Sequence, residues 1–220
     1  MKGEKYPKFA GFNAIDCTSG SMNKVAGLEV KKAFSPMLIG PAKYGADPEA
    51  AIFENLWQYG KCFRGLRHID GNGEPTEIWR QWRNTGYKST KGDRHPQGTK
   101  TDKVKFIGED GKRRFEYLQS EFARYGGEKM DYLTARKKVY APTYAKLVRD
   151  TKVFVELRRQ VLAGENIQIV DLDGPKDEER SHVVTAELLR RKINDPTASF
   201  GHGYILAGLL AGIEPEEYTA

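Results

Sequence analysis

The chain has 220 residues, of which 39% are hydrophobic and 11% aromatic, an apolar content that supports a buried core and argues against disorder. It has no run of about 18 apolar residues, no apolar stretch near its start and two cysteines, Cys17 and Cys62, which are too few for a disulfide framework or a four-ligand zinc site. We therefore expect a cytoplasmic protein, and its formal net charge of +6 is a weak indication of an anionic partner.

The first part of the chain predicts short strands and two helices. Residues 1–30 have few apolar repeats and predict irregular or short-stranded structure, and residues 34–41 predict a strand or an extended loop. Asp47, followed by a proline and a glutamate, is typical of a helix start. The apolar face of that helix is Ile52, Leu56, Tyr59 and Phe63. A second helix is expected from about residue 75 to residue 86.

The second part is expected to be mainly helical. Apolar periodicity and turn residues predict, in order, helices over residues 115–125, 129–140 and 148–162, a strand over 167–172, and helices over 185–193 and 204–213. Pro142 either ends the helix before it or begins the next one. The sequence therefore predicts an α+β fold: a mainly helical single domain over residues 1–220, with a small sheet and a basic insertion at about 88–114.

The basic insertion carries nine Lys/Arg and four Asp/Glu, so it holds five of the six net positive charges. We expect an exposed excursion that contains a hairpin, with strands over residues 104–107 and from residue 113 onward. It is a solvated loop, an arm that contacts phosphates, or a surface for a protein partner. As an arm, its candidate nucleic-acid-binding residues are Lys91, Arg94, Lys100, Lys103, Lys105, Lys112, Arg113 and Arg114.

Common cofactor and catalytic motifs are missing from the sequence. It has no GxGxxG after a strand, no GKS or GKT phosphate loop, no HExxH and no GxSxG. The four histidines are far apart in the chain, and Cys62 is expected to be a small core residue. We therefore expect no cofactor and no metal site.

One group of polar residues fits a single helix face. Glu54, Gln58 and Lys61 are separated by four and then three residues, which places a carboxylate, an amide and an ammonium in a row, and Trp57 flanks them. The row is either an ordinary exposed polar face or, because the rest of the helix is apolar, the wall of a pocket.

A second group lies around the predicted strand and the last helix. Asp171 (or Asp173) follows the apolar residues of the strand, and an aromatic–glycine turn precedes the helix. Amides at such a helix start bind anionic oxygens, and glycines let a phosphate approach the backbone. Asp171 is thus a candidate catalytic residue, or it caps the next turn. The turn is a glycine-rich helix entry or a substrate-binding segment formed by Phe200, Gly201, His202 and Gly203.

Taken in chain order, the two groups resemble the NADAR family, a small helical α+β domain linked to NAD and ADP-ribose chemistry. That family has an FSNF-type opening, a helix reading roughly S-E-H-x-F-Q-x-x-K, a buried strand ending in an acid, and an aromatic-Gly-x-Gly turn before a final helix. Here residues 34–37 read FSPM, and Glu54, Gln58 and Lys61 match the helix at identical offsets. The sequence departs from the family at Asn55, where the family has His, and in the last motif, where Gly203 or Tyr204 replaces an Asn.

The resemblance implies cleavage of an N-glycosidic bond on an ADP-ribosylated or otherwise modified base, with Glu54 as the key carboxylate. Such cleavage passes through an oxocarbenium-like state, which one carboxylate stabilises while an acid or base handles the proton. Glu54 and Lys61 would be catalytic, with Lys61 orienting Glu54 or holding a phosphate. Gln58 and Trp57 would bind substrate, Trp57 by stacking on a ring, and the amides of residues 201–203 would bind a pyrophosphate. The partners would be an ADP-ribosyl or modified nucleotide, and DNA held by the basic insertion.

A looser similarity, to bacteriophage proteins associated with DNA base hypermodification, supports a second hypothesis. It covers the segments SPMLIGP, FENLWQYGKCF and YLTARKKVYAPTY and assigns no catalytic residue. It implies a transferase that adds a group to a modified pyrimidine in DNA, acting in the host cytoplasm, and it agrees with the basic insertion. The third hypothesis is a nucleic-acid-binding module without catalysis, whose affinity falls steeply with salt.

Overall fold

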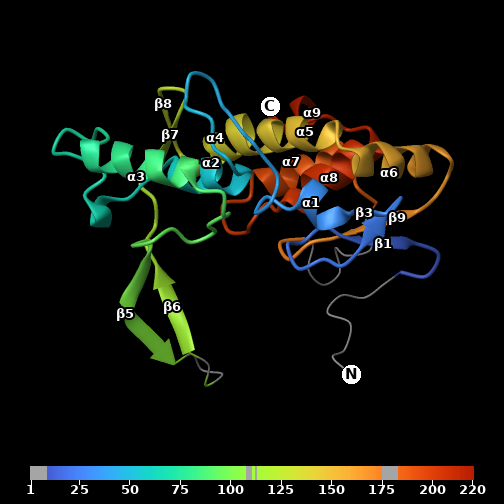
Figure 1. Ribbon diagram of the computed structural model, residues 1–220, viewed down its shortest axis with the longest axis horizontal. Helices are drawn as coiled ribbons and strands as arrows, with labels where there is room; N and C mark the ends of the chain where they lie inside the picture. Colours follow the sequence, from blue (N-terminus) through green and yellow to red (C-terminus); the bar gives the residue numbers. More distant parts are fainter. Residues whose placement is uncertain (1–8, 108–110, 112, 175–182) are drawn as a thin grey trace. The chain divides into compact units, whose positions relative to one another are not determined.

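A computed structural model describes residues 9–107, 111, 113–174 and 183–220, and these have the mixed α+β fold predicted from the sequence, with 41% helix and 15% strand (Figure 1). The chain forms two compact units. The first unit combines the N-terminal part of the chain, up to Ile39, with Arg136–Ala220, and the second unit is Gly40–Ala135. None of the described helices is long and apolar enough to cross a membrane.

The strands of the first unit are short. β1 (Asn13–Asp16) pairs in parallel with β9 (Ile167–Val170) along its full length, and β2 (Lys24–Val25) pairs in antiparallel fashion with β3 (Leu28–Glu29). Because the carboxyl ends of parallel strands meet at the same edge of a sheet, the residues that follow β1 and β9 are brought together. Polar side chains converge at this edge.

The helices of the first unit surround α8 (His202–Ala211), which is apolar on all sides and buried over most of its length. This helix contacts β9 and three other helices. They are α5 (Ala141–Arg149), α6 (Lys152–Leu162) and α7 (Ala186–Ile193). The other helical segments are α1 (Val30–Phe34), the π-helical segment η2 (Arg136–Tyr140) and α9 (Glu216–Thr219).

A buried arginine closes the C-terminal end of α7. The guanidinium of Arg136 donates hydrogen bonds of 2.9–3.5 Å to the carbonyl groups of Lys192, Ile193, Asp195 and Ala198. A helix end leaves carbonyl groups without intrahelical partners, and a cation there also interacts favourably with the helix dipole. Arg136 therefore fixes the segment that leads from α7 to α8.

Among the residues that the structure describes, the second unit has three helices, a 3-10 turn and two small antiparallel sheets. Its helical segments are α2 (Phe53–Tyr59), η1 (Arg64–Leu66), α3 (Glu77–Lys88) and α4 (Tyr132–Ala135). Its strands are β4 (Lys61–Cys62), β5 (Lys100–Ile107), β6 (Arg113–Tyr117), β7 (Phe122–Tyr125) and β8 (Glu128–Met130).

The sheet β4–β7–β8 and helix α3 enclose an apolar cluster in the second unit. The cluster consists of Cys62, Ile69, Trp79 and Phe122, with Trp82 packed against it. Cys62 is fully buried, which confirms its prediction as a core residue. The cluster holds α3 against β4, and so it fixes the position of the residues at the end of α2.

Several predicted elements are confirmed, together with the residues that begin them. Thr76 caps α3 by accepting a hydrogen bond from the amide of Trp79, and Thr185 caps α7 in the same way. Pro142 lies in the first turn of α5, so it begins a helix. The predicted hairpin is β5–β6, in which Ile107 lies opposite Arg113; residues 109 and 110, in the turn expected between the two strands, lie outside the described residues.

Asp47 does not begin a helix, contrary to the prediction. The helix begins later, at Phe53, and Asp47 is instead a buried carboxylate. It accepts a hydrogen bond of 2.8 Å from the amide of Gly126 and pairs with Arg83 at 3.3 Å. These contacts with residues far along the chain override the local capping pattern.

Three predicted helices are corrected. Residues 115–125 form β6 and β7 rather than a helix, because β7 pairs with β4 and β8. Residues 129–140 are divided among β8, α4 and η2. Residues 148–162 are interrupted, because Thr151 caps α6 and thereby separates it from α5.

Candidate functional site

The predicted polar row is present in the second unit, and we call Glu54, Gln58 and Lys61 the α2 row. Glu54 and Gln58 lie on α2, and Lys61 is the first residue of β4. The side-chain amide of Gln58 donates to Glu54 Oε1 at 2.8 Å, and Lys61 Nζ donates to Gln58 Oε1 at 2.8 Å. One amide thus links the carboxylate to the ammonium.

The α2 row is partly enclosed. Glu54 is 7% exposed, while Gln58 and Lys61 are half-buried. The row therefore is not an ordinary exposed polar face, which was the alternative interpretation. It leads from a buried carboxylate to two groups that solvent reaches.

Burial changes the acid–base behaviour of Lys61. It lowers the pKa of the ammonium from 10.5 to about 8, and the charge of Glu54 opposes this change. The Lys61 backbone is held in place because the Trp79 indole donates to its carbonyl group at 3.1 Å. An ammonium with a pKa of about 8 exchanges its proton near physiological pH, which suits an acid–base role.

Trp57 supports the row rather than presenting a free ring. Its side chain is 7% exposed, its ring stacks on Tyr125 with centroids 6.1 Å apart, and Lys61 Nζ lies 4.7 Å from the centroid of the Trp57 ring. The Tyr125 hydroxyl also donates to the carbonyl group of Trp57 at 2.7 Å. These contacts give Trp57 a packing role, and they do not favour the predicted stacking on a substrate ring.

Asn55, where the sequence departs from the NADAR pattern, anchors the start of the basic insertion. Its fully buried amide donates to the carbonyl groups of Ser89 and Lys91 at 2.9 and 3.0 Å and accepts from the amide of Asp93 at 2.9 Å. The Tyr59 hydroxyl adds a bond of 3.3 Å to the Asp93 carboxylate. The beginning of the insertion is therefore held against α2.

The base of the hairpin carries an aromatic and cationic group. The His95 ring lies against Tyr117 with centroids 4.5 Å apart, and Lys100 Nζ lies 5.7 Å from the Tyr117 centroid. The pKa of His95 is lowered, first by burial and then by nearby cations that include Lys100 and Lys61. Lys61 is thus within electrostatic range of this part of the insertion.

The predicted nucleic-acid-binding residues are only partly described by the structure. Lys91, Arg94 and Arg113 are exposed, and Lys100 is half-buried. The side chains of Lys103, Lys105 and Arg114, and the whole of Lys112, lie outside the described residues. The described cations therefore surround the anchored base of the insertion and the start of β6.

In the first unit, Asp171 clasps the end of β9 to the start of α8. Its Oδ1 accepts from the Leu172 amide at 2.7 Å, and its Oδ2 accepts from the Gly203 amide at 2.9 Å. A Cβ added at Gly201 or Gly203 would lie 2.4 Å from Asp171 Oδ2 or 2.6 Å from Asp171 Cβ. The glycines thus admit a carboxylate of the chain itself, and the Gly203 amide does not offer the predicted open pyrophosphate site.

The other residues of this turn are also packed. Phe200 is 5% exposed and stacks on Tyr204 with centroids 5.2 Å apart, so its surroundings favour a core role over substrate binding. Asp171 belongs to the first unit, whereas Glu54 and Lys61 belong to the second. The residues predicted to be catalytic are therefore divided between the two units.

A cysteine that the sequence did not indicate joins Asp171 and His202. Cys17 follows β1, its thiol donates to the carbonyl group of Val170 at 3.2 Å, and its own carbonyl group lies 3.0 Å from His202 Nε2. Burial, and then the charge of Asp171, raise the pKa of the thiol. The cluster forms because β1 pairs in parallel with β9, and no local sequence pattern predicts that pairing.

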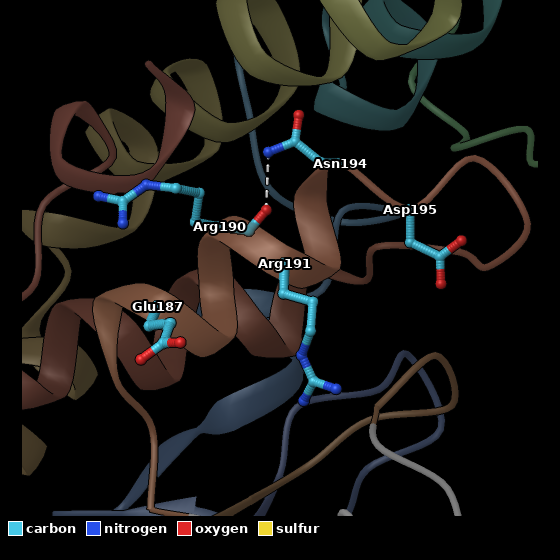
Figure 2. A pocket seen from close by; sticks show the side chains of 5 residues that line it. All are labelled: Glu187, Arg190, Arg191, Asn194 and Asp195. Carbon is cyan, nitrogen blue, oxygen red and sulfur yellow. Dashed lines mark hydrogen bonds between the residues drawn. The ribbon is translucent and has the colours of Figure 1, made fainter.

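A shallow pocket of about 390 Å³ lies along one side of α7 and the turn after it (Figure 2). Its lining residues are Glu187, Arg190, Arg191, Asn194 and Asp195. The Asn194 amide donates to the Arg190 carbonyl group at 2.8 Å, as Figure 2 shows. None of the sequence-predicted site residues lines this pocket.

Comparisons with known proteins do not identify the chain. No protein-family model, no curated protein and no solved structure matches it.

Proposed function

We propose that this chain is an enzyme that acts on an ADP-ribosylated or otherwise modified nucleobase and cleaves its N-glycosidic bond, with Glu54 as the key carboxylate. The observation that carries the proposal is the α2 row, in which a buried carboxylate is linked through Gln58 to an ammonium with a pKa of about 8. The motif resemblance to the NADAR family points to the same residues.

The chemistry requires a negative charge beside the sugar and a proton for the departing base. Glu54 supplies the carboxylate that stabilises an oxocarbenium-like state. Lys61 is protonated at neutral pH, and its lowered pKa makes it a better acid than an exposed lysine. Gln58 bridges the two groups, because its amide donates to Glu54 and accepts from Lys61.

DNA is the macromolecular substrate that the charge distribution favours. Asn55 holds the start of the basic insertion against the helix that carries Glu54, and residues 88–114 hold five of the six net positive charges. Cations next to a reaction centre hold the phosphate backbone while the centre acts on a base. The same charges would serve the transferase hypothesis, so the direction of the reaction must be measured.

The test is a mass-spectrometric assay with ADP-ribosylated nucleosides, ADP-ribosylated DNA, and DNA that carries hydroxymethylated pyrimidines. We expect loss of ADP-ribose with the wild-type chain and no turnover with Glu54→Gln, which keeps the shape of the side chain and removes its charge. The control is Glu77→Gln, because Glu77 is an exposed carboxylate in the first turn of α3. Circular dichroism would establish that each variant is folded.

Two outcomes would replace the proposal. A mass gain on DNA that depends on Glu54 would establish group transfer in place of cleavage. Unchanged substrates, together with DNA binding that weakens steeply with salt and is the same in Glu54→Gln, would establish a binding module without catalysis. Turnover by Glu54→Gln at the wild-type rate would also refute the assigned role of Glu54.

A further inference from the structure

We propose that Cys17, Asp171 and His202 form a binding site for a Zn²⁺ ion in the first unit. Each residue offers one ligand atom, a sulfur, an oxygen and a nitrogen, and these atoms all lie within 4.8 Å of one another. They come from the ends of β1 and β9 and from the start of α8. This site shares no residue with the α2 row, and the proposal does not depend on the function proposed above.

The spacing of the ligand atoms fits a tetrahedral ion. His202 Nδ1 and Asp171 Oδ2 are 3.3 Å apart. Zn–N and Zn–O bonds of about 2.0–2.1 Å at a tetrahedral angle place their two ligand atoms about 3.3–3.4 Å apart. A Zn–S bond of about 2.3 Å requires the sulfur to lie about 3.5 Å from each of them. Because the ligand atoms lie within 4.8 Å of one another, each distance to the sulfur must shorten by at most about 1.3 Å.

Hydrogen bonds around the three ligand side chains orient them, as the contacts around metal-binding residues do in known metal sites. His202 Nε2 lies 3.0 Å from the Cys17 carbonyl group, a bond that directs Nδ1 toward Asp171. A zinc-binding histidine characteristically donates its second ring N–H to a carbonyl group or a carboxylate. Asp171 is itself held by the amides of Leu172 and Gly203.

The backbone holds the ligands before an ion arrives. The Cys17 amide donates to the Val170 carbonyl group at 3.0 Å, which extends the β1–β9 pairing up to the ligands. Gly201 and Gly203 have no room for a Cβ beside Asp171, so the start of α8 is fitted closely to the carboxylate. Little rearrangement is therefore needed on binding, which favours affinity.

Charge and ligand type select zinc over the hard cations. Cys17 is fully buried and His202 is 9% exposed, and a buried ion must be neutralised by its ligands. The Cys17 thiol gives up its proton to solvent when the ion binds, and the resulting thiolate and the carboxylate together balance a dication. Sulfur and imidazole ligands suit Zn²⁺, whereas Mg²⁺ and Ca²⁺ take oxygen ligands. Three protein ligands leave a fourth position for water.

The test is a titration of the full chain, first stripped with a chelator, with Zn²⁺ in competition with a chromophoric indicator. We expect one Zn²⁺ per chain. Co²⁺ in place of Zn²⁺ should give a thiolate-to-cobalt charge-transfer band and the strong visible absorption of tetrahedral cobalt. The proposal would be overturned if the chain does not bind Zn²⁺ more tightly than the indicator does, or if bound Co²⁺ shows no thiolate band. The three residues would then form only a hydrogen-bonded clasp.

Variants separate this cluster from other metal-binding groups. Cys17→Ser should abolish the thiolate band. Loss of a residue that only hydrogen-bonds to a metal ligand lowers affinity by about 10- to 100-fold, and His202→Gln, which removes a ligand, should lower the Zn²⁺ affinity by more than that. The matched control is Cys62→Ser, because Cys62 is the other buried cysteine and lies in the second unit. If Cys17→Ser fails to fold by circular dichroism, His202→Gln decides. Wild-type affinity in His202→Gln, or a thiolate band lost in Cys62→Ser, would refute the assignment.

Discussion

Replacement of Lys61 by methionine tests the acid–base character of the α2 row through protein stability. The folded chain lowers the pKa of Lys61 from 10.5 to about 8, chiefly by burial. At pH 7 the ammonium is protonated in both the folded and the unfolded chain, so the full cost of burying its charge is present. Between pH 8 and 10.5 the folded chain holds Lys61 neutral while the unfolded chain keeps the proton, so the free energy of unfolding rises with pH.

The size of this effect follows from the two pKa values. One pH unit of difference corresponds to about 1.4 kcal/mol, so the fall from 10.5 to about 8 is worth at most about 3 kcal/mol. Integrated from pH 7 to pH 10, the wild-type chain should gain about 2.5 kcal/mol of unfolding free energy relative to Lys61→Met. The variant also loses the bond to Gln58 and the contact with Trp57, which adds a constant offset at pH 7; the pH dependence of both contacts is already contained in the pKa of Lys61.

The assay is urea unfolding of both chains at several values of pH from 7 to 10. Other groups that titrate in this range are shared by the two chains and cancel in the difference. Lys43→Met is the control, because Lys43 is an exposed lysine of the same unit. A wild-type-minus-variant difference that stays flat with pH, or one that Lys43→Met reproduces, would refute a desolvated ammonium at Lys61.

Two further substitutions test contacts that the sequence alone does not define. Gly203→Ala places a Cβ 2.6 Å from the Cβ of Asp171 and should lower the free energy of unfolding by about 1–3 kcal/mol in urea, although alanine favours helix. The control is Gly71→Ala, where nothing lies within 4 Å of the added Cβ, and it should change the free energy of unfolding by no more than about 0.5 kcal/mol. Equal effects of the two substitutions would contradict the packing argument. Asn55→Ala removes the Asn55 bonds to the Ser89 carbonyl group and the Asp93 amide, and one of the two side-chain bonds to the Lys91 carbonyl group, and should cost about 1–3 kcal/mol. It should also speed amide exchange in the loop that it anchors, whereas the exposed control Asn72→Ala should not; unchanged exchange would show that other contacts hold that loop.

Sequence patterns predicted elements where local chemistry decides the structure. Thr76 and Thr185 cap two helices whose positions the sequence predicted, and β9 is the apolar run that the sequence indicated. The spacing of Glu54 and Lys61 also placed them in one row, even though the helix ends at Tyr59 and Lys61 begins a strand. Side chains three or four residues apart remain neighbours on a helix and just beyond its end. The prediction that Glu54 and Lys61 lie close together therefore did not require the exact end of the helix.

Patterns failed where pairing over long sequence separations decides the structure. Phe122 has helix-compatible neighbours, but its strand pairs with β4 some sixty residues earlier. Asp47 has a local capping pattern and is used instead by Gly126 and Arg83. Cys17 meets its partners only because β1 pairs with β9. Periodicity in a single segment carries no information about such pairings.

The second unit is inserted in the sequence of the first, and this determines which unit can be completed first during synthesis. Gly40–Ala135 is continuous, so a ribosome that has released these residues has released a whole compact unit. β1 must wait for β9, about 150 residues later, before its hydrogen bonds form. At about 5–20 residues per second, that wait lasts many seconds. During synthesis the N-terminal strand is therefore an unpaired edge, and a chaperone that protects it would still be needed after the whole of the second unit has been synthesised.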